Sequence, residues 1–105
     1  MQDLKLFEHE EFGGLDVLMI DGKPYFPARQ CAEALGYRDP YVGIRQHCKG
    51  VVKMTSPSAG GKQKKSFIPE GDLYRLIVGS TLPSAERFER WVFDEVRPSI
   101  RKHGT

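Results

Sequence analysis

The sequence contains few of the residues that form disulfide cross-links in small domains or bind metals. Cys31 and Cys48 are the only cysteines in 105 residues, and the three histidines lack the spacing of metal ligands. A disulfide scaffold needs a denser set of cysteines, and a structural zinc site needs Cys or His residues in close groups. We therefore expect two reduced, partly buried thiols, no metal site and no cofactor.

Long apolar runs are also missing. No stretch approaches the roughly 20 apolar residues that a membrane-spanning helix needs. The start of the chain, Met1–Lys5, lacks the apolar segment of a signal peptide. The sequence therefore predicts no membrane partner and a location in the compartment of synthesis.

Patterns typical of enzymes do not occur either. His47 and Cys48 are adjacent, and neighbouring residues on one helix point in different directions, so we do not expect a nucleophile and base pair. Glu95 has no second carboxylate spaced to work with it, which favours a structural ion pair over a catalytic acid. The glycines at 60 and 61 lack the spacing of a phosphate-binding loop. We expect no catalytic residues and no enzyme activity.

The excess of positive charge is small, with a net charge of +2, and it is unevenly distributed. The first 18 residues hold one basic residue, Lys5, and five acids, which are Asp3, Glu8, Glu10, Glu11 and Asp16. The remainder of the chain is correspondingly basic. This distribution permits a basic face on a nearly neutral molecule.

The length and composition predict one domain, residues 1–105. A hydrophobic content of 39% with 29% charged residues is typical of a folded chain, and 105 residues suffice for a single modest core. Val17–Ile20 and Lys23–Phe26 flank Asp21-Gly22, a pair that favours a tight turn, so they predict a β-hairpin. Pro24 cannot donate to the ladder, and its amide position should face away from the partner strand or lie at an edge.

A second hairpin is predicted from Val51–Thr55 and Lys65–Ile68, two segments that carry strand-favouring residues. The segment between them, Ser56–Gln63, is rich in Ser, Pro and Gly, and we expect a mobile tip. Lysines gather around this tip, as they do in basic wings that follow DNA phosphates. A solvated loop is the alternative.

Two short helices are predicted between the hairpins. Pro27–Leu35 has a helical pattern that Gly36 is placed to end. Asp39 can cap a second helix, with Pro40 in its first turn, that continues to about Cys48. The pair resembles a helix-turn-helix arrangement only loosely.

The C-terminal third predicts two further helices. Glu70–Val78 forms the first, and the second is amphipathic from Ala85 onward, with a broad apolar arc that includes Phe88, Trp91 and Val92. Pro98 should kink or break this helix near Arg97, after which it resumes to about Lys102. The predicted fold class is α+β, with two β-hairpins packed against two short helices and a C-terminal helical pair.

Three strings of residues carry a family likeness. Phe26–Pro40, Glu70–Ile77 and Ala85–Arg101, in this order, resemble the N-terminal domain of the BRO family, which occurs in phage and prophage antirepressors and in large DNA viruses. The likeness extends from about Phe7 to Gly104. The resemblance implies a nucleic-acid-binding module of the kind that a separate C-terminal domain usually follows, so we expect this chain to be either a natural short form or an excised domain.

The chain departs from the family pattern at three positions. Gln30 replaces a usual aspartate, Asp72 a usual glycine, and Arg97 a common leucine. The first two could alter a cap or a turn, and the third adds charge near Pro98. We expect these changes to affect local contacts and not the fold.

The leading hypothesis is a DNA-binding module of a phage or prophage antirepressor-like regulator in the cytoplasm of a bacterial host. It would contact duplex DNA mainly through phosphates. The alternative is a module that binds a repressor protein directly, which suits the low net charge and the acidic start. The sequence leaves self-association as a homo-oligomer open.

Basic residues from three parts of the chain, with one tyrosine, are the predicted DNA-binding residues. They are Arg38, Tyr41, Arg45, Lys49, Lys62, Lys64, Lys65, Arg97, Arg101 and Lys102. Each has a structural alternative: Tyr41 could be an aromatic at the edge of the core, Arg45 a surface ion-pair partner, and Arg101 with Lys102 a favourable cationic helix end.

Overall fold

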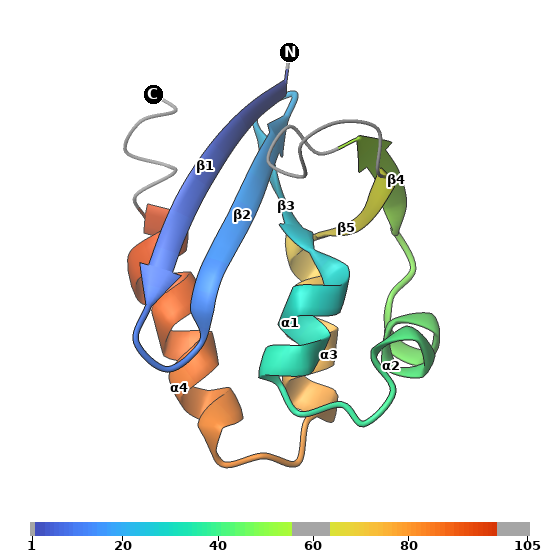
Figure 1. Cartoon of the computed structure of the whole chain (residues 1–105), viewed down its shortest axis with the longest axis vertical. Coiled ribbons are helices and arrows are strands. Elements are labelled where there is room, and N and C mark those ends of the chain that lie inside the picture. The colour runs from blue at the N-terminus through green and yellow to red at the C-terminus, as the bar shows by residue number, and fades with distance from the viewer. Residues whose placement is uncertain (1, 56–63, 99–105) are drawn as a thin grey trace.

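Pairing between the third and fifth strands joins both predicted hairpins into one sheet. The computed structural model describes residues 2–55 and 64–98, and its five strands are all antiparallel, in the order β1-β2-β3-β5-β4 (Figure 1). The strands are β1 (Gln2–His9), β2 (Gly13–Ile20), β3 (Lys23–Pro27), β4 (Val52–Thr55) and β5 (Lys64–Pro69). The helices are α1 (Ala28–Ala34), α2 (Pro40–His47), α3 (Glu70–Gly79) and α4 (Ser84–Arg90), which continues as the π-helical segment η2 (Trp91–Val96). The predicted α+β class is confirmed.

The β2–β3 hairpin has the predicted turn. Asp21 and Gly22 have φ angles of 52° and 78°, and Ile20 pairs with Lys23 across the two-residue loop. Hydrogen-bonded and non-hydrogen-bonded pairs alternate along antiparallel strands, so Pro24, one position further, falls in a non-hydrogen-bonded pair. Its missing amide hydrogen therefore costs no bond to β2, as predicted.

Strand β1 was not predicted from the sequence. It pairs with β2 over eight positions, from Gln2 opposite Ile20 to His9 opposite Gly13. The acidic start of the chain is therefore half of a third hairpin. The alternation of Leu4 and Leu6 with charged residues was the available signal, and it is short.

Both short helices have the predicted ends. The Asp39 Oδ1 atom accepts hydrogen bonds from the backbone amides of Tyr41 and Val42, at 3.1 and 3.4 Å, and so caps α2. Gly36, with a φ of 81°, directly follows the residue that ends α1. The turn between them is tight enough that α1 and α2 contact each other.

The apolar side of the last helix is buried, as predicted. Phe88, Trp91, Val92 and Val96 are each at most 6% exposed and belong to the main core. Figure 1 shows α4 lying behind the β1–β2 hairpin. At the hairpin tip, Phe12 packs edge to face against Phe88, with ring centroids 5.1 Å apart, which fixes the hairpin to the helix.

The last helix is distorted earlier than predicted. Its backbone stays helical through Pro98, and its hydrogen bonding widens between Trp91 and Val96, where the Arg97 amide donates to the Val92 carbonyl. A wider turn relieves the crowding between the proline ring and the carbonyl one turn before it. The widening also rotates later residues from their regular helical positions, and Glu95, which a regular helical wheel places within the apolar arc, is exposed.

Two predictions lie outside the described residues. These are the mobile tip at residues 56–63 and the resumption of the helix to Lys102. Among the described helices, none combines the length and the apolar character that crossing a bilayer requires.

A buried carboxylate on α3 holds the connection between α2 and β4. Asp72 is 1% exposed. Its Oδ2 atom accepts hydrogen bonds from the backbone amides of Lys49 and Gly50, at 3.0 and 2.6 Å, and its Oδ1 atom accepts one from the Arg75 guanidinium at 2.8 Å. A Cβ atom on Gly50 would lie only 3.0 Å from the Pro69 ring, so a side chain there would disturb this close approach.

Replacing Asp72 with alanine should destabilise the domain. The Lys49 and Gly50 amides would lose their acceptor, and we expect a loss of about 3 kcal/mol in the free energy of unfolding, measured by urea denaturation. Arg75→Ala, which leaves both amides bonded, should cost clearly less. Equal losses in the two variants would show that the backbone bonds are not the important part of this contact.

Candidate nucleic-acid interface

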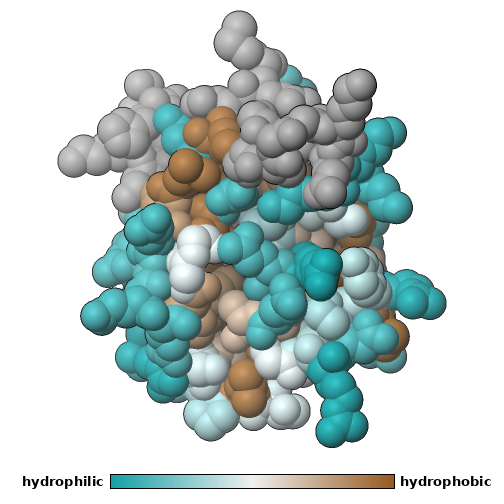
Figure 2. Space-filling view, in the orientation of Figure 1, coloured by the Kyte–Doolittle hydropathy of each residue, from teal (hydrophilic) through white to brown (hydrophobic). Residues whose placement is uncertain are grey.

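One face of the molecule, built from α1, α2, β4 and β5, is hollowed and lined with basic side chains. Two adjoining hollows of about 680 and 500 Å³ share Tyr41, Ile44 and Lys53 in their walls. The walls also include one acid, Glu33, and we call their basic and aromatic residues the basic face: Arg29, Tyr41, Arg45, Lys49, Lys53, Lys64 and Lys65. In Figure 2, hydrophilic side chains gather on the surface over α1, beside this region.

Helix α2 supplies the centre of the basic face. Tyr41 and Arg45 are four residues apart, so they lie on the same side of the helix. Tyr41 is 58% exposed, so it does not pack into the core. Lys49 follows the helix, and the Asp72 carboxylate fixes its backbone. The local sequence therefore places three predicted residues side by side.

The β4–β5 hairpin supplies the remaining lysines. Lys53 lies opposite Ser66, and Lys65 lies opposite Met54, in the confirmed second hairpin. Lys64 is exposed, whereas Lys65 is half-buried with its Nζ atom 3.8 Å from the Asp16 carboxylate. The hairpin thus carries its cations to the same hollows as α2.

The cations of the basic face and the arginines of the last helix differ in how they are neutralised. Within residues 4–54 and 64–98, no carboxylate forms an ion pair with Arg45, Lys49, Lys53 or Lys64. The arginines that the structure describes in the last helix and directly after it have acidic partners, in the pairs Arg87–Glu11, Arg90–Glu86 and Arg97–Glu70. Unneutralised positive charge therefore collects at the hollows, not on the last helix.

The structure brings together five of the ten predicted binding residues: Tyr41, Arg45, Lys49, Lys64 and Lys65. Arg38 is exposed on the loop between α1 and α2 and lines neither hollow. Lys62, Arg101 and Lys102 lie outside the described residues.

Arg97 does not join the basic face. Its Nε atom lies 3.0 Å from the Glu70 carboxylate, at the start of α3. Figure 1 shows α4 and α2 on opposite sides of the molecule, with α1 and α3 between them. The sequence did not predict that Arg97 lies apart from the basic face, because this separation depends on how the helices pack.

Two residues of the basic face were not predicted. The Arg29 guanidinium carbon lies 5.8 Å from the centre of the Tyr41 ring, within reach of a cation–π contact, and Arg29 also lies 3.7 Å from Glu33. Lys53 alternates with Val52 and Met54 along β4, so strand periodicity could have placed it on the solvent side. Nothing in the sequence linked Arg29 to Tyr41.

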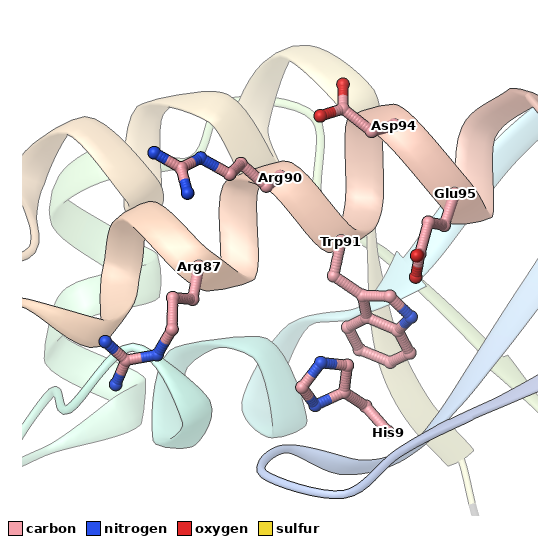
Figure 3. A pocket seen from close by; sticks show the side chains of 6 residues that line it. All are labelled: His9, Arg87, Arg90, Trp91, Asp94 and Glu95. Atoms are coloured by element: carbon pink, nitrogen blue, oxygen red, sulfur yellow. The ribbon is translucent and has the colours of Figure 1, made fainter.

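A smaller hollow of about 350 Å³ lies between the β1–β2 hairpin and the last helix. Figure 3 shows the His9 ring against Trp91 and the Glu95 carboxylate pointing toward the indole. The Arg87 guanidinium donates to both oxygens of Glu11, at 2.8 and 2.7 Å, and this hydrogen bond lowers the pKa of Glu11. The arginines of this hollow are thus engaged within the protein, which makes it a weaker candidate for binding an anion.

The thiols are free, and burial suppresses their ionisation. Cys31 is fully buried, and burial raises the pKa of its thiol. Burial, together with the nearby Asp72 carboxylate, raises the pKa of Cys48 to about 11. A protonated thiol is a poor nucleophile, which agrees with the structural interpretation of His47 and Cys48. Over the described part of the chain, no group of three His, Cys, Asp or Glu side chains could hold a metal ion.

Comparison with known proteins identifies the family. The model of the BRO family N-terminal domain matches residues 15–98, and the chain belongs to this family. It is 44% identical over 90 residues to an uncharacterized protein of Haemophilus influenzae, with 84% of this chain and 45% of that protein covered. It is also 29% and 30% identical to proteins 201R and 289L of Invertebrate iridescent virus 6, both named as Bro-N domain-containing proteins.

The chain spans less than half the length of these relatives. The alignments cover 78% of this chain with each viral protein, and only 25% and 24% of those proteins. No solved structure matches the chain.

The three departures from the family pattern all make polar contacts. The Gln30 side-chain amide donates to the Gly14 carbonyl and ties α1 to β2. Asp72 anchors the turn after α2, and Arg97 pairs with Glu70. Each departure thus takes part in a local polar contact of this domain.

Cys48 should react slowly with thiol reagents. Because its pKa is about 11 instead of 9, its thiolate fraction at pH 8 is roughly 100-fold smaller than that of an ordinary thiol. Its rate of reaction with iodoacetamide should rise about tenfold per pH unit up to pH 11. Cys48→Ala, which leaves only Cys31, should be unreactive in the folded state. Rapid alkylation of Cys48 at neutral pH would contradict the assigned environment.

Proposed function

We propose that this domain binds duplex DNA through the basic face, mainly by contacts to phosphates, as the DNA-binding module of an antirepressor-like regulator. The observation that supports the proposal is the collection of cations around two connected hollows, where Arg45, Lys49, Lys53 and Lys64 have no acidic partner among the described residues. Membership of the BRO family is consistent with it.

Phosphate contacts explain how a protein with a net charge of only +2 binds a polyanion. Affinity then depends on the local charge of one face, since each neutralised phosphate releases condensed counterions into solution. The tip of the β1–β2 hairpin lies away from α2 and β4 (Figure 1), so the acids there oppose binding only weakly, whereas Asp16 of β2 pairs with Lys65. The planar groups of this face are limited to the Tyr41 ring and the guanidinium groups of Arg29 and Arg45, and therefore we expect little base readout.

Direct binding to a repressor is the second candidate function. The observation that favours it is the tip of the β1–β2 hairpin, where Glu8 and Glu10 are exposed and Phe12 is partly so. A small acidic surface around an aromatic residue suits a basic protein partner. Because the chain spans less than half of its relatives, antirepressor activity is proposed here for a whole protein that contains this domain.

A salt titration of duplex binding distinguishes the two functions. If about six phosphates are neutralised, the logarithm of affinity should fall with the logarithm of salt at a slope near −5. The Arg45→Ala, Lys53→Ala double variant should bind more weakly at low salt and reduce the slope by about 2. Fluorescence anisotropy of a labelled duplex measures both quantities.

A matched control removes the same charge elsewhere. Lys23→Ala with Arg90→Ala lowers the net charge equally, and both residues are exposed and lie outside the two hollows of the basic face. This variant should keep nearly the wild-type slope. Equal weakening by the two double variants would mean that total charge, not the basic face, determines binding. A flat salt response, or no binding at low salt, would contradict DNA binding altogether.

A further inference from the structure

The outer edge of β1 has features of a strand that pairs with another chain. Sheet order places β1 and β4 at the two edges, and of the elements in the described ranges only β2 pairs with β1. Strand β1 has eight residues, no proline, and an uninterrupted register. Leu6, in its middle, is 66% exposed. Figure 2 shows apolar side chains at the surface over the upper part of the β1–β2 hairpin.

The two edges of the sheet differ in how they resist such pairing. Strand β4 is only four residues long and carries the exposed Lys53, two features that limit pairing between edges. On β1, Lys5 lies on the same side of the sheet as His9, which contacts Trp91 of the last helix. The opposite side carries Leu4, Leu6 and Glu8. The charged neighbours of Leu6 on this side are both acids, Glu8 on β1 and Asp16, which lies opposite Leu6 on β2.

The turn between β2 and β3 determines which backbone groups of β1 face outward. Ile20 and Lys23 form the hydrogen-bonded pair that closes a two-residue turn, so even-numbered residues of β2 direct their amides and carbonyls toward β3. The Gly14 carbonyl points in this direction, since it accepts a hydrogen bond from Gln30 on α1, the helix that follows β3. Odd-numbered residues of β2 therefore bond to β1, and Leu4, Leu6 and Glu8 direct their backbone groups away from the sheet.

An antiparallel edge of this kind is self-complementary about a two-fold axis. A two-fold axis at Leu6 places Leu6 opposite its own copy and Leu4 opposite Glu8, with matching outward donors and acceptors. An axis at Lys5 would set two ammonium groups directly opposite each other, which is unfavourable. An axis at Phe7 would place Leu6 opposite Glu8 and leave Leu6 without an apolar partner. The Leu6 register covers the exposed leucine with another leucine and also avoids the opposed ammonium groups of the Lys5 register.

We propose that β1 is a self-association surface, in which two copies of the chain pair through antiparallel β1 strands about an axis at Leu6. The two five-stranded sheets then form one continuous sheet of ten strands. The basic faces, which include β4, remain open at the two far ends. The inference does not depend on the proposed function, because β1 and the basic face share no residue.

The expected affinity is low. One pair of strand edges buries less surface than the roughly 1,200 Å² of a stable interface, which places the dimer in the weak class. A dissociation constant on the order of 100 µM is reasonable for such a contact. Two copies that bind one duplex would associate more strongly, since the duplex raises their effective concentration.

Charge exchange at Leu6 tests both the surface and the register. In Leu6→Lys the two-fold axis brings two ammonium groups together, and in Leu6→Glu two carboxylates, so each variant alone should associate at least tenfold more weakly than wild type. An equimolar mixture should recover association, because the pair is then of opposite charge. Sedimentation velocity over a concentration series measures these equilibria without DNA.

Two controls test whether the Leu6 variants still fold and still bind DNA, so that a loss of association can be assigned to strand pairing. Leu6 is mostly exposed, so both variants should show wild-type circular dichroism and thermal unfolding. Both should also retain the salt slope of duplex binding at protein concentrations too low for dimers. The proposal is overturned if wild type stays monomeric near its solubility limit, if Leu6→Lys associates as well as wild type, or if the mixture fails to recover association that each variant alone has lost.

Discussion

The contact between the Asp72 carboxylate and the amides of Lys49 and Gly50 is the constraint on which the proposed binding surface depends. It joins the start of α3 to the turn through which α2 leads into β4. Without it, α2 would be held by its apolar side alone, through Gly43 and Ile44. A short helix needs such tertiary contacts, since eight residues are too few for independent stability. The position of Tyr41, Arg45 and Lys49 relative to the β4–β5 hairpin thus follows from one buried carboxylate.

Ion pairing divides the basic residues into two groups. The arginines of α4 and the segment after it bind acids of β1–β2, α4 and α3, and they fasten the last helix to its surroundings. Exposed pairs of this kind contribute little to stability singly, and their main effect here is to neutralise the charge of that helix. Four cations around the two hollows lack such partners in the described ranges and stay available to an external polyanion: Arg45, Lys49, Lys53 and Lys64.

Local signals in the sequence were sufficient for most elements of the fold. The β2–β3 hairpin was predicted from Asp21-Gly22, α2 from its Asp39 cap, and the last helix from the apolar arc that includes Trp91. These signals were sufficient because turns, caps and helical periodicity depend on residues close in the chain. Strand β1 was missed because its alternation is short. The π-helical turn could not be predicted from a regular wheel, which assumes a constant 100° per residue.

The candidate site was predictable only in part, for a related reason. Tyr41, Arg45 and Lys49 follow from one helix, and Lys64 and Lys65 from one strand, yet their assembly around common hollows depends on packing across the chain. The same packing removes Arg97 from the group and adds Arg29 and Lys53. Asp72, a position noted as a departure from the family pattern, became informative only when its two backbone partners were seen.

The central claim is that duplex DNA binds at the face held in place by Asp72. The most direct measurement is an NMR titration of the isotope-labelled domain with a short duplex, which follows every backbone amide. The account predicts that the largest shift changes fall on α2, on Lys49 and Gly50, and on the β4–β5 hairpin, while α4 and the β1–β2 hairpin change little. Changes that concentrate instead on α4 around Arg97, or on the acidic hairpin tip, would contradict it.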